Sequence, residues 1–317
     1  MIPSRKVLAV VSILFSFLTG FGTGSSRAQS FTNLSLDGGR ISWSELAFSA
    51  NSFAVSVTVE MHLKTLPAAE VEAALIISPR GISVQPSTPA AWYSVVNTTI
   101  DPIFRSPVKL MHAVWFNPED AAVLGWVRLD RGEDDQKKIY RFTREGVFRR
   151  RLEPRDRQEA GQGPEKWTDV KDSFYPYDLV RSGCPSVSKN QLLIYIISAA
   201  VNSLGRQPLS ICVFGKRQLH NVQLRSGGTQ PLKVDFIEKR AQGDVHRQGK
   251  VEALKIMIEA TPMATDQEEV EEFSFLGFHK DIAIFVDPVS RLPIQASGIL
   301  PTAGRVDLKL REVRLKN

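Results

Sequence analysis

Few residues of this chain have the types and spacing that catalysis or metal binding requires. The histidines lack the HxH and HExxH spacings of zinc sites; they are His62, His112, His220, His246 and His279. No G-x-S-x-G motif marks a serine nucleophile, and the carboxylates fall mostly in expected loops, where no acid–base pair can be named. The sequence therefore predicts no catalytic residue, no metal site and no cofactor, and favours a protein that is not an enzyme.

Two cysteines, Cys184 and Cys212, could form a covalent link. In an oxidising compartment they can form a disulfide, which would stabilise the fold by about 3–4 kcal/mol. Two separate thiols are the alternative, and the sequence leaves both open. A nucleophilic Cys184 would need a histidine partner, and nothing in the sequence supplies one.

The segment 190–205, NQLLIYIISAAVNSLG, is the longest apolar stretch beyond the N-terminal region with helix boundaries. Ser188 or Asn190 can act as its N-cap, and Gly205 can end it in the left-handed conformation. A buried strand is the alternative, because several of its residues are β-branched. The helix is favoured.

A helical period places four polar residues of this segment on one narrow stripe, with apolar residues around the rest. These ligand-lining candidates are Gln191, Tyr195, Ser198 and Asn202. If the stripe faces inward, it lines a binding site; if it faces water, the helix is a plug that fills the interior. The plug is favoured.

Two charged runs need an explanation. Arg149, Arg150 and Arg151 could contact phosphate or sugar-acid groups, or they could be solvated strand residues, which is the favoured interpretation. The acidic run 266–272 lacks the alternating oxygen ligands and the glycine of a calcium loop. We expect it to be a solvated loop.

The N-terminus has the pattern of a secretory signal peptide, residues 1–28. Arg5 and Lys6 precede the apolar stretch 7–21, and Ser26-Arg27-Ala28 offers a cleavage site after Ala28. Removal of these 28 residues would lower the net charge from +6 to +3, because three basic residues are lost. The sequence thus predicts a periplasmic or secreted protein with no transmembrane segment after cleavage, and it gives little support to a nucleic-acid partner.

The elements that must position these residues are mostly strands. Segment 53–64 alternates apolar and polar residues, which is typical of a strand with one buried face. Further strands are predicted at 41–48, 74–77 and 92–99, with a loop or short turn at 67–72. Two hairpins join 110–116 to 123–129 and 137–143 to 147–152.

A second β series follows the charged stretch 153–166, which is a linker or an excursion from the sheet. Its predicted strands are 209–214, 218–225, 232–239, 251–259, 282–286, 292–298 and 306–315. A turn is expected at Ser226-Gly227-Gly228, and a one-residue slip near Arg311-Glu312 predicts a β-bulge. The fold class is therefore all-β with one main helix. We expect a single domain, 29–317, in which a large curved antiparallel sheet forms a barrel or half-barrel around the helix.

The order of features resembles the bacterial exported family catalogued as domain of unknown function three-one-zero-eight. Arg291, Leu292, Pro293 and Ile294 match its late Arg-x-Pro-x motif, and Tyr195 stands at the tyrosine of its helix. The chain departs from the pattern where it has Asn190 instead of Asp and Leu193 instead of Ser. The resemblance implies a large curved antiparallel sheet in an envelope protein, and no known activity or site residue.

These features favour a non-catalytic cell-envelope protein that binds a lipid or glycan-like ligand inside or along the curved sheet. An envelope assembly or scaffold protein that acts through protein–protein contacts is the alternative. A hydrolase comes third.

Overall fold

The computed structural model describes residues 31, 34–51, 55–102, 107–132, 134–263, 272–301 and 303–316. In this part of the chain fifteen strands form one sheet, in the order β8-β7-β6-β5-β4-β3-β2-β1-β15-β14-β13-β12-β11-β10-β9. The predicted fold class, mostly antiparallel β with one main helix, is confirmed. The predicted signal peptide and residues 266–271 of the acidic run lie outside the described residues.

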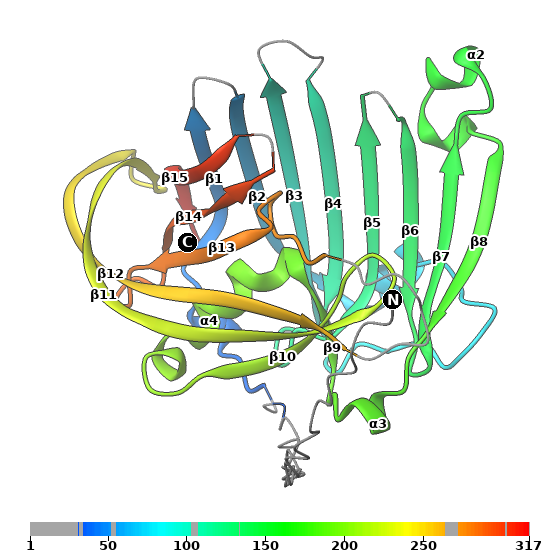
Figure 1. Ribbon diagram of the computed structural model, residues 1–317, viewed down its shortest axis with the longest axis horizontal. Coiled ribbons are helices and arrows are strands. Elements are labelled where there is room, and N and C mark those ends of the chain that lie inside the picture. Colours follow the sequence, from blue (N-terminus) through cyan, green and yellow to red (C-terminus); the bar gives the residue numbers. More distant parts are fainter. Residues whose placement is uncertain are drawn as a thin grey trace, which may run out of the picture.

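The first eight strands form a meander in which each strand pairs with the next one along the chain (Figure 1). They are β1 (Trp43–Asn51), β2 (Val55–Pro67), β3 (Ala90–Pro102), β4 (Val108–Phe116), β5 (Val123–Arg131), β6 (Gln136–Phe142), β7 (Gly146–Glu153) and β8 (Asp169–Pro176). Alternate residues of β2 are buried from Val55 to Leu63, as the period of two predicts. Both predicted hairpins, β4–β5 and β6–β7, are confirmed.

The second series turns back and closes on itself. It contains β9 (Val187–Lys189), β10 (Leu209–Phe214), β11 (Leu219–Lys239), β12 (Val245–Pro262), β13 (Lys280–Val286), β14 (Pro293–Leu300) and β15 (Gly304–Leu315). Because the end of β11 pairs in parallel with β15, strands β11 to β15 form a ring, and β15 also pairs with β1 (Figure 1). The parallel pairings β11–β15 and β9–β10 were not predicted.

The helical segments are short except for one. They are η1 (Gly38–Arg40), α1 (Ala68–Ala74), α2 (Arg157–Ala160), η2 (Pro164–Lys166), α3 (Leu179–Ser182), η3 (Asn190–Leu192) and α4 (Leu193–Leu204). The predicted loop or short turn at 67–72 and the predicted strand 74–77 are wrong, because this segment forms α1 and then leaves regular structure. Its alanines and glutamates are strong helix formers, and Val71 is buried against the convex face of the sheet.

Two irregularities bend the strands. The turn predicted at Ser226-Gly227-Gly228 is wrong: β11 continues through these residues with a bulge between Ser226 and Thr229, because β12 pairs with it on both sides of that point. The predicted bulge near Arg311 is confirmed, since Ala47 pairs with Glu312 and Phe48 with Leu310. Stretch 153–166 is an excursion that carries α2 and η2 between the paired strands β7 and β8.

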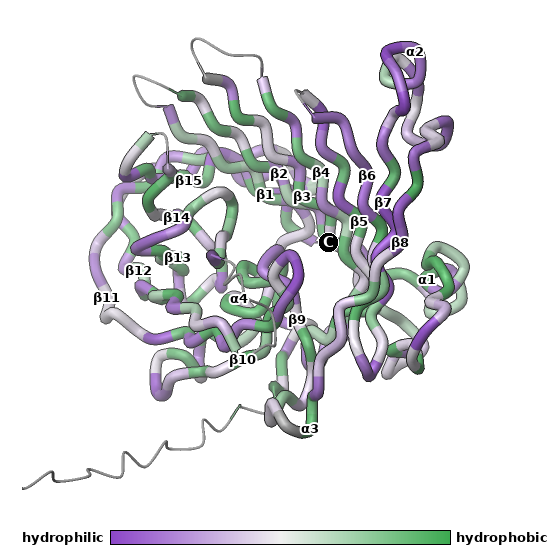
Figure 2. Tube along the Cα trace, turned by 45° about the vertical axis from the view of Figure 1, so that its right-hand side comes forward, coloured by the Kyte–Doolittle hydropathy of each residue, from purple (hydrophilic) through white to green (hydrophobic). Residues whose placement is uncertain are grey.

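The core lies on the concave side, where α4 packs against β11 and β13 (Figure 1). Figure 2 shows α4 as an apolar segment enclosed by the curved sheet. A smaller apolar cluster lies on the convex face beneath α1 and includes Val71, Ala91 and Trp115. The sheet therefore buries both faces near its middle strands.

Candidate functional site

The predicted helix exists as the 3-10 turn η3 followed by α4, and it fills the centre of the sheet. All residues of α4 are buried except Asn202 and Ser203. Its predicted caps are wrong: no side chain caps its start, and Gly205 has a right-handed φ of −67°. The chain needs no left-handed residue there, because the N–H groups of Arg206 and Gln207 both bond to the carbonyl of Ser203.

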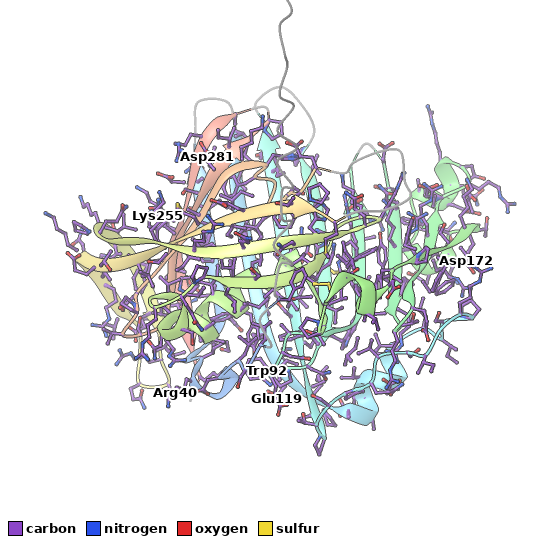
Figure 3. All side chains as sticks on the ribbon, turned by 60° about the horizontal axis from the view of Figure 1, so that its bottom comes forward. Arg40, Trp92, Glu119, Asp172, Lys255 and Asp281 are labelled. Atoms are coloured by element: carbon purple, nitrogen blue, oxygen red, sulfur yellow. A yellow bond between two sulfur atoms is a disulfide. The ribbon has the colours of Figure 1, made fainter. Side chains whose placement is uncertain are left out.

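The four stripe residues do not share one environment. Tyr195 and Ser198 are fully buried, and the Tyr195 hydroxyl donates to the Pro118 carbonyl at 2.5 Å. The Tyr195 ring also packs edge-on against Trp92 and Phe116; Figure 3 labels Trp92. Gln191 is half-buried and Asn202 is exposed. The middle of the stripe is thus part of the core, and its first residue, Gln191, lies at a cavity.

This cavity, which we call the α4 pocket, has a volume of about 200 Å³ and lies at the start of the helix. Its apolar walls come mainly from β3, β4 and the segment 273–276, and include Val96, Ile100, Leu110, Phe273 and Leu276. Its polar lining comes from five elements or loops and includes Thr98, His112, Arg128, Lys189, Asn190 and Gln191. An apolar cavity with a few convergent polar groups is the usual form of a small-molecule site.

His112 of β4 forms the polar floor of the α4 pocket and is a neutral hydrogen-bonding group. Burial, with the positive charges of Arg128 and Lys189, lowers the pKa of His112 to about 3. Its Nδ1 accepts a hydrogen bond from Trp126 Nε1 at 3.3 Å, and Gln191 Nε2 lies 3.3 Å from the same atom. The proton of the neutral ring is therefore on Nε2, which makes this nitrogen a donor.

Lys189, the last residue of β9, places a buried positive charge at the pocket. Its Nζ donates to the carbonyls of Phe214 and Gly215 at 2.7 and 2.6 Å. The same ammonium lies 4.0 Å from the centre of the Trp126 ring, a cation–π geometry. Lys189 is only 2% exposed, so these contacts replace the water that the charge loses.

Within the described part of the chain, two amide oxygens at the pocket have no hydrogen-bond partner. Asn190 uses its Nδ2 to donate to the Ser274 carbonyl at 2.6 Å, but its Oδ1 is buried and unbonded. The Oε1 of Gln191 is buried and unbonded in the same way. A buried acceptor without a partner costs about 1–3 kcal/mol, and a ligand hydroxyl or amide would satisfy it.

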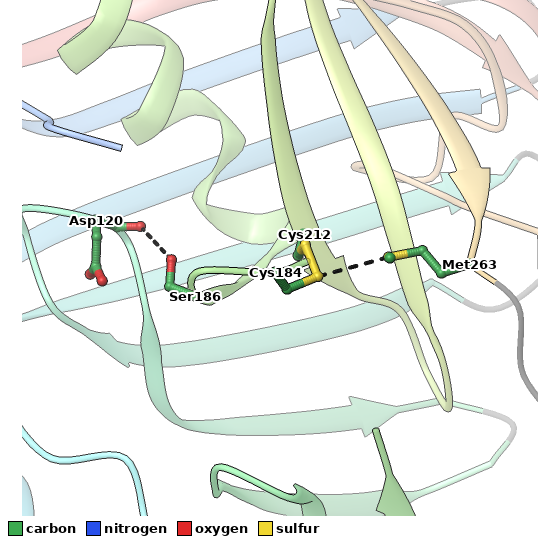
Figure 4. The surroundings of a disulfide bond; sticks show 5 residues. All are labelled: Asp120, Cys184, Ser186, Cys212 and Met263. Carbon is green, nitrogen blue, oxygen red and sulfur yellow. Dashed lines mark hydrogen bonds between the residues drawn. A yellow bond between two sulfur atoms is a disulfide. The ribbon is translucent and has the colours of Figure 1, made fainter. Parts of the chain in front are cut away.

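A disulfide anchors the chain just before the pocket. Cys184 and Cys212 are joined at an S–S distance of 2.00 Å (Figure 4). The Sγ of Cys184 contacts the Met263 sulfur at 3.9 Å, and Ser186 donates to the Asp120 carbonyl at 3.5 Å. The bridge links the segment before β9 to β10, and so holds Lys189 in place.

Several residues of this site were not singled out from the sequence. From the sequence, His112 is noted only as a histidine without zinc-site spacing, and Trp126, Arg128 and Lys189 have no assigned role. The available signal was the register of the β4–β5 hairpin, which sets His112 opposite Arg128 and Trp126 opposite Val114. In this register the polar side chains of His112 and Arg128 lie on the same face of the sheet as Trp126. Polar residues on an otherwise apolar face would have indicated a cavity there.

Within the described ranges, no group of three or more His, Cys, Asp or Glu side chains is arranged to hold a metal ion. Within the same ranges, no helix has both the length and the apolar character needed to cross a membrane.

Comparison with known proteins shows a structural likeness. No protein-family model matches the chain, and no curated protein matches it. A crystal structure of a β-barrel-like protein of the domain of unknown function DUF1849 from Brucella abortus is similar, with a TM-score of 0.45 and 7% sequence identity. The match covers 86% of this chain and 96% of that one. At this level of similarity it carries no argument about function, and the resemblance to family three-one-zero-eight stays a prediction.

Proposed function

We propose that this chain is an exported, non-catalytic cell-envelope protein that binds a lipid-like or glycan-like ligand in the α4 pocket, along the concave face of the sheet. Export is inferred from the sequence of residues 1–28 alone. The observation that carries the proposal is the pocket itself, a cavity of about 200 Å³ with apolar walls and polar groups at its floor.

The chemistry of the pocket supports a ligand that has both apolar and polar parts. Its walls offer aliphatic and aromatic surface, while Asn190 and Gln191 offer unbonded acceptors. The helix fills most of the concave side, and the α4 pocket lies at its start. A second, larger hollow of about 900 Å³ lies at its other end, beside Asn202, and its lining includes more charged residues. We therefore expect a small apolar group, such as the end of an acyl chain or one face of a sugar ring, to enter the pocket.

The alternative, a scaffold that adds a partner strand to its sheet, has weaker support. The edge strand β8 carries Asp169, Lys171 and Asp172, and charged residues on an edge strand oppose pairing with another chain.

Native mass spectrometry of gently purified protein tests the proposal. We expect the wild type to retain an added mass in the range of a lipid or glycan. Leu110→Trp, which fills the α4 pocket, should abolish the added mass. Leu232→Trp, which fills a separate hollow of about 210 Å³ between β11, β14 and β15, should retain it.

The proposal is wrong if the wild type carries no added mass and also takes up no short-chain phosphatidylcholine or oligosaccharide offered to it. Circular dichroism and thermal unfolding of both variants show whether the fold is intact, so that loss of ligand is not confused with loss of structure.

A further inference from the structure

Like charges lie opposite one another on four neighbouring strands. The pairing register sets Arg128 of β5 opposite Lys138 of β6, and Lys138 opposite Arg151 of β7. Arg151 in turn lies opposite Lys171 of β8. Side chains directly opposite across a pair are near neighbours, and like charges at such positions destabilise a sheet. Three members of the row have an ion-pair partner on their own strand: Arg128 with Asp130, Arg151 with Glu153 and Lys171 with Asp169. The repulsion therefore falls on Lys138, which lies between two of these cations.

The row lies on the concave face and runs into the α4 pocket. The same register continues from Arg128 to His112 and Val96, and all three residues line the pocket. Figure 2 shows hydrophilic stretches in β6, β7 and β8, in the halves toward α2. We call Arg128, Lys138, Arg149 and Arg151 the basic strip; Arg149 lies on the same face, two residues before Arg151.

The carboxylates of this face neutralise only half of the basic strip. Asp130 pairs with Arg128 at 2.6 Å, and Glu153 pairs with Arg151 at 3.2 Å. Neither Lys138 nor Arg149 forms an ion pair with any residue in the described ranges; Arg149 donates instead to the Ser173 hydroxyl at 3.1 Å and lies over the Tyr175 ring. The strip thus keeps two uncompensated positive charges.

Two donors of the strip also lack partners. The Nε atoms of Arg149 and Arg151 are buried and form no hydrogen bond to any residue that the structure describes. By contrast, Arg150 projects from the opposite face and pairs with Asp172 at 2.8 Å, with both side chains more than 40% exposed. All three arginines are half-buried, and Arg150 lies on the face opposite to that of Arg149 and Arg151.

We propose that the basic strip binds the phosphate group of an amphipathic ligand whose apolar part occupies the α4 pocket. The inference rests on the function proposed above and adds the chemical class of the ligand. Arg128 belongs to both the strip and the pocket lining, so one molecule can reach both.

A phosphate monoester fits the strip better than other head groups. It carries a charge of about −1.5 to −2 near neutral pH, which matches the two uncompensated positive charges. Guanidinium groups bind phosphate through two parallel N–H donors, and an ammonium adds a point charge. A zwitterionic head group would bring a cation against Lys138 and be disfavoured. The pKa of Lys138 is lowered first by burial and then by Arg128, and the nearby carboxylate of Asp130 does not offset this effect.

Isothermal titration calorimetry with three probes tests the inference: dihexanoyl phosphatidate, dihexanoyl phosphatidylcholine and inorganic phosphate. We expect the wild type to bind the phosphatidate at least about tenfold more tightly than either other probe, the loss expected for one charge-assisted contact. Lys138→Met and Arg149→Met should each weaken phosphatidate binding by about tenfold or more on the same basis. Neither substitution leaves a carboxylate without its ion-pair partner, because neither Lys138 nor Arg149 forms an ion pair in the described ranges.

Arg150→Met is the matched control: it removes one positive charge from the same strand on the convex face, where Figure 3 labels its partner Asp172. It should leave all three affinities unchanged. Equal binding of phosphatidate and phosphatidylcholine, or unchanged phosphatidate binding in Lys138→Met, would refute the phosphate site while leaving the proposed function standing. Tight binding of inorganic phosphate alone would refute the amphipathic ligand. If neither lipid binds and no added mass is found, the proposed function itself fails.

Discussion

At the residue scale, the pKa of Lys138 shows the effect of the concave face on a cation that has no ion-pair partner among the described residues. Burial lowers its pKa to about 8, together with the positive charges of Arg128, Arg149 and Arg151, while Asp130 acts in the opposite direction. The ammonium is thus held in an environment that favours its neutral form. A bound anion would reverse this and raise the pKa of Lys138 again.

This setting predicts a pH dependence of stability that belongs to Lys138. The pKa of about 8 in the folded state lies below the ordinary value of 10.5, so between these values the unfolded chain binds more protons. The free energy of unfolding therefore gains a contribution that rises with pH through this window. Urea unfolding at pH 7 and pH 10 should show a larger increase, or a smaller decrease, for the wild type than for Lys138→Met. An identical change in both proteins would contradict the depressed pKa.

Alternation along a strand predicts that Arg149 and Arg151 share a face and that Arg150 takes the other. The sequence does not show which face is concave, because both faces of β7 carry apolar as well as basic residues. The pairing of Arg151 with Lys138 depends on strand register, and register is fixed by the whole hairpin. The basic strip could therefore be suspected from single residues but not assembled from them.

At the scale of elements, the disulfide stabilises β9, a strand too short to be stable by its own pairing. β9 has three residues, and among the described strands it pairs with β10 alone, yet it carries the buried Lys189 to the pocket. The crosslink between Cys184 and Cys212 spans 28 residues and restricts the segment that contains β9 and α4.

Removal of this crosslink should therefore cost stability and loosen the pocket end of α4. We expect the double variant Cys184→Ser/Cys212→Ser to lose about 3–4 kcal/mol of unfolding free energy, from the entropy of the opened loop. Urea unfolding measures this loss. A thiol titration of the denatured wild type should find free thiols only after reduction; two free thiols without reductant would contradict the bridge.

Local elements were the best predicted part of the fold. The hairpins β4–β5 and β6–β7 follow from short polar turns between alternating stretches, and α4 follows from one long apolar segment. The misplaced turn at Gly227-Gly228 shows the limit of this approach, because a glycine pair signals a turn or a bulge equally well. Only the partner strand β12, which is continuous beside it, decides between them.

At the scale of the whole molecule, the curvature of the sheet could be predicted from the sequence, but the closure of strands β11 to β15 into a ring could not. The one-residue slip at Arg311 indicated a bend in β15, and the bulge is present there. The ring, however, depends on the parallel contact of residues 237–239 with 312–314. No local pattern encodes this contact, since it arises from the accumulated twist of five strands.

The sheet order has a consequence for how the chain folds. The strands of the meander pair with their sequence neighbours, whereas β1 joins β15 through residues such as Glu45 and Arg314, which are 269 positions apart. Closing that loop costs about 2–3 kcal/mol more than closing a short hairpin. Pulse-labelling hydrogen exchange should therefore find the amides of β3 to β6 protected before the β1–β15 seam; simultaneous protection would rule this order out.

Until β15 arrives, one edge of β1 has no partner strand, because β1 is synthesised before β15. An unpaired edge is where a growing sheet can join the wrong chain. The seam between β1 and β15 is thus a place where the folding chain is exposed to misassembly. If the chain is exported as proposed, this edge stays open after translocation until β15 has joined the sheet.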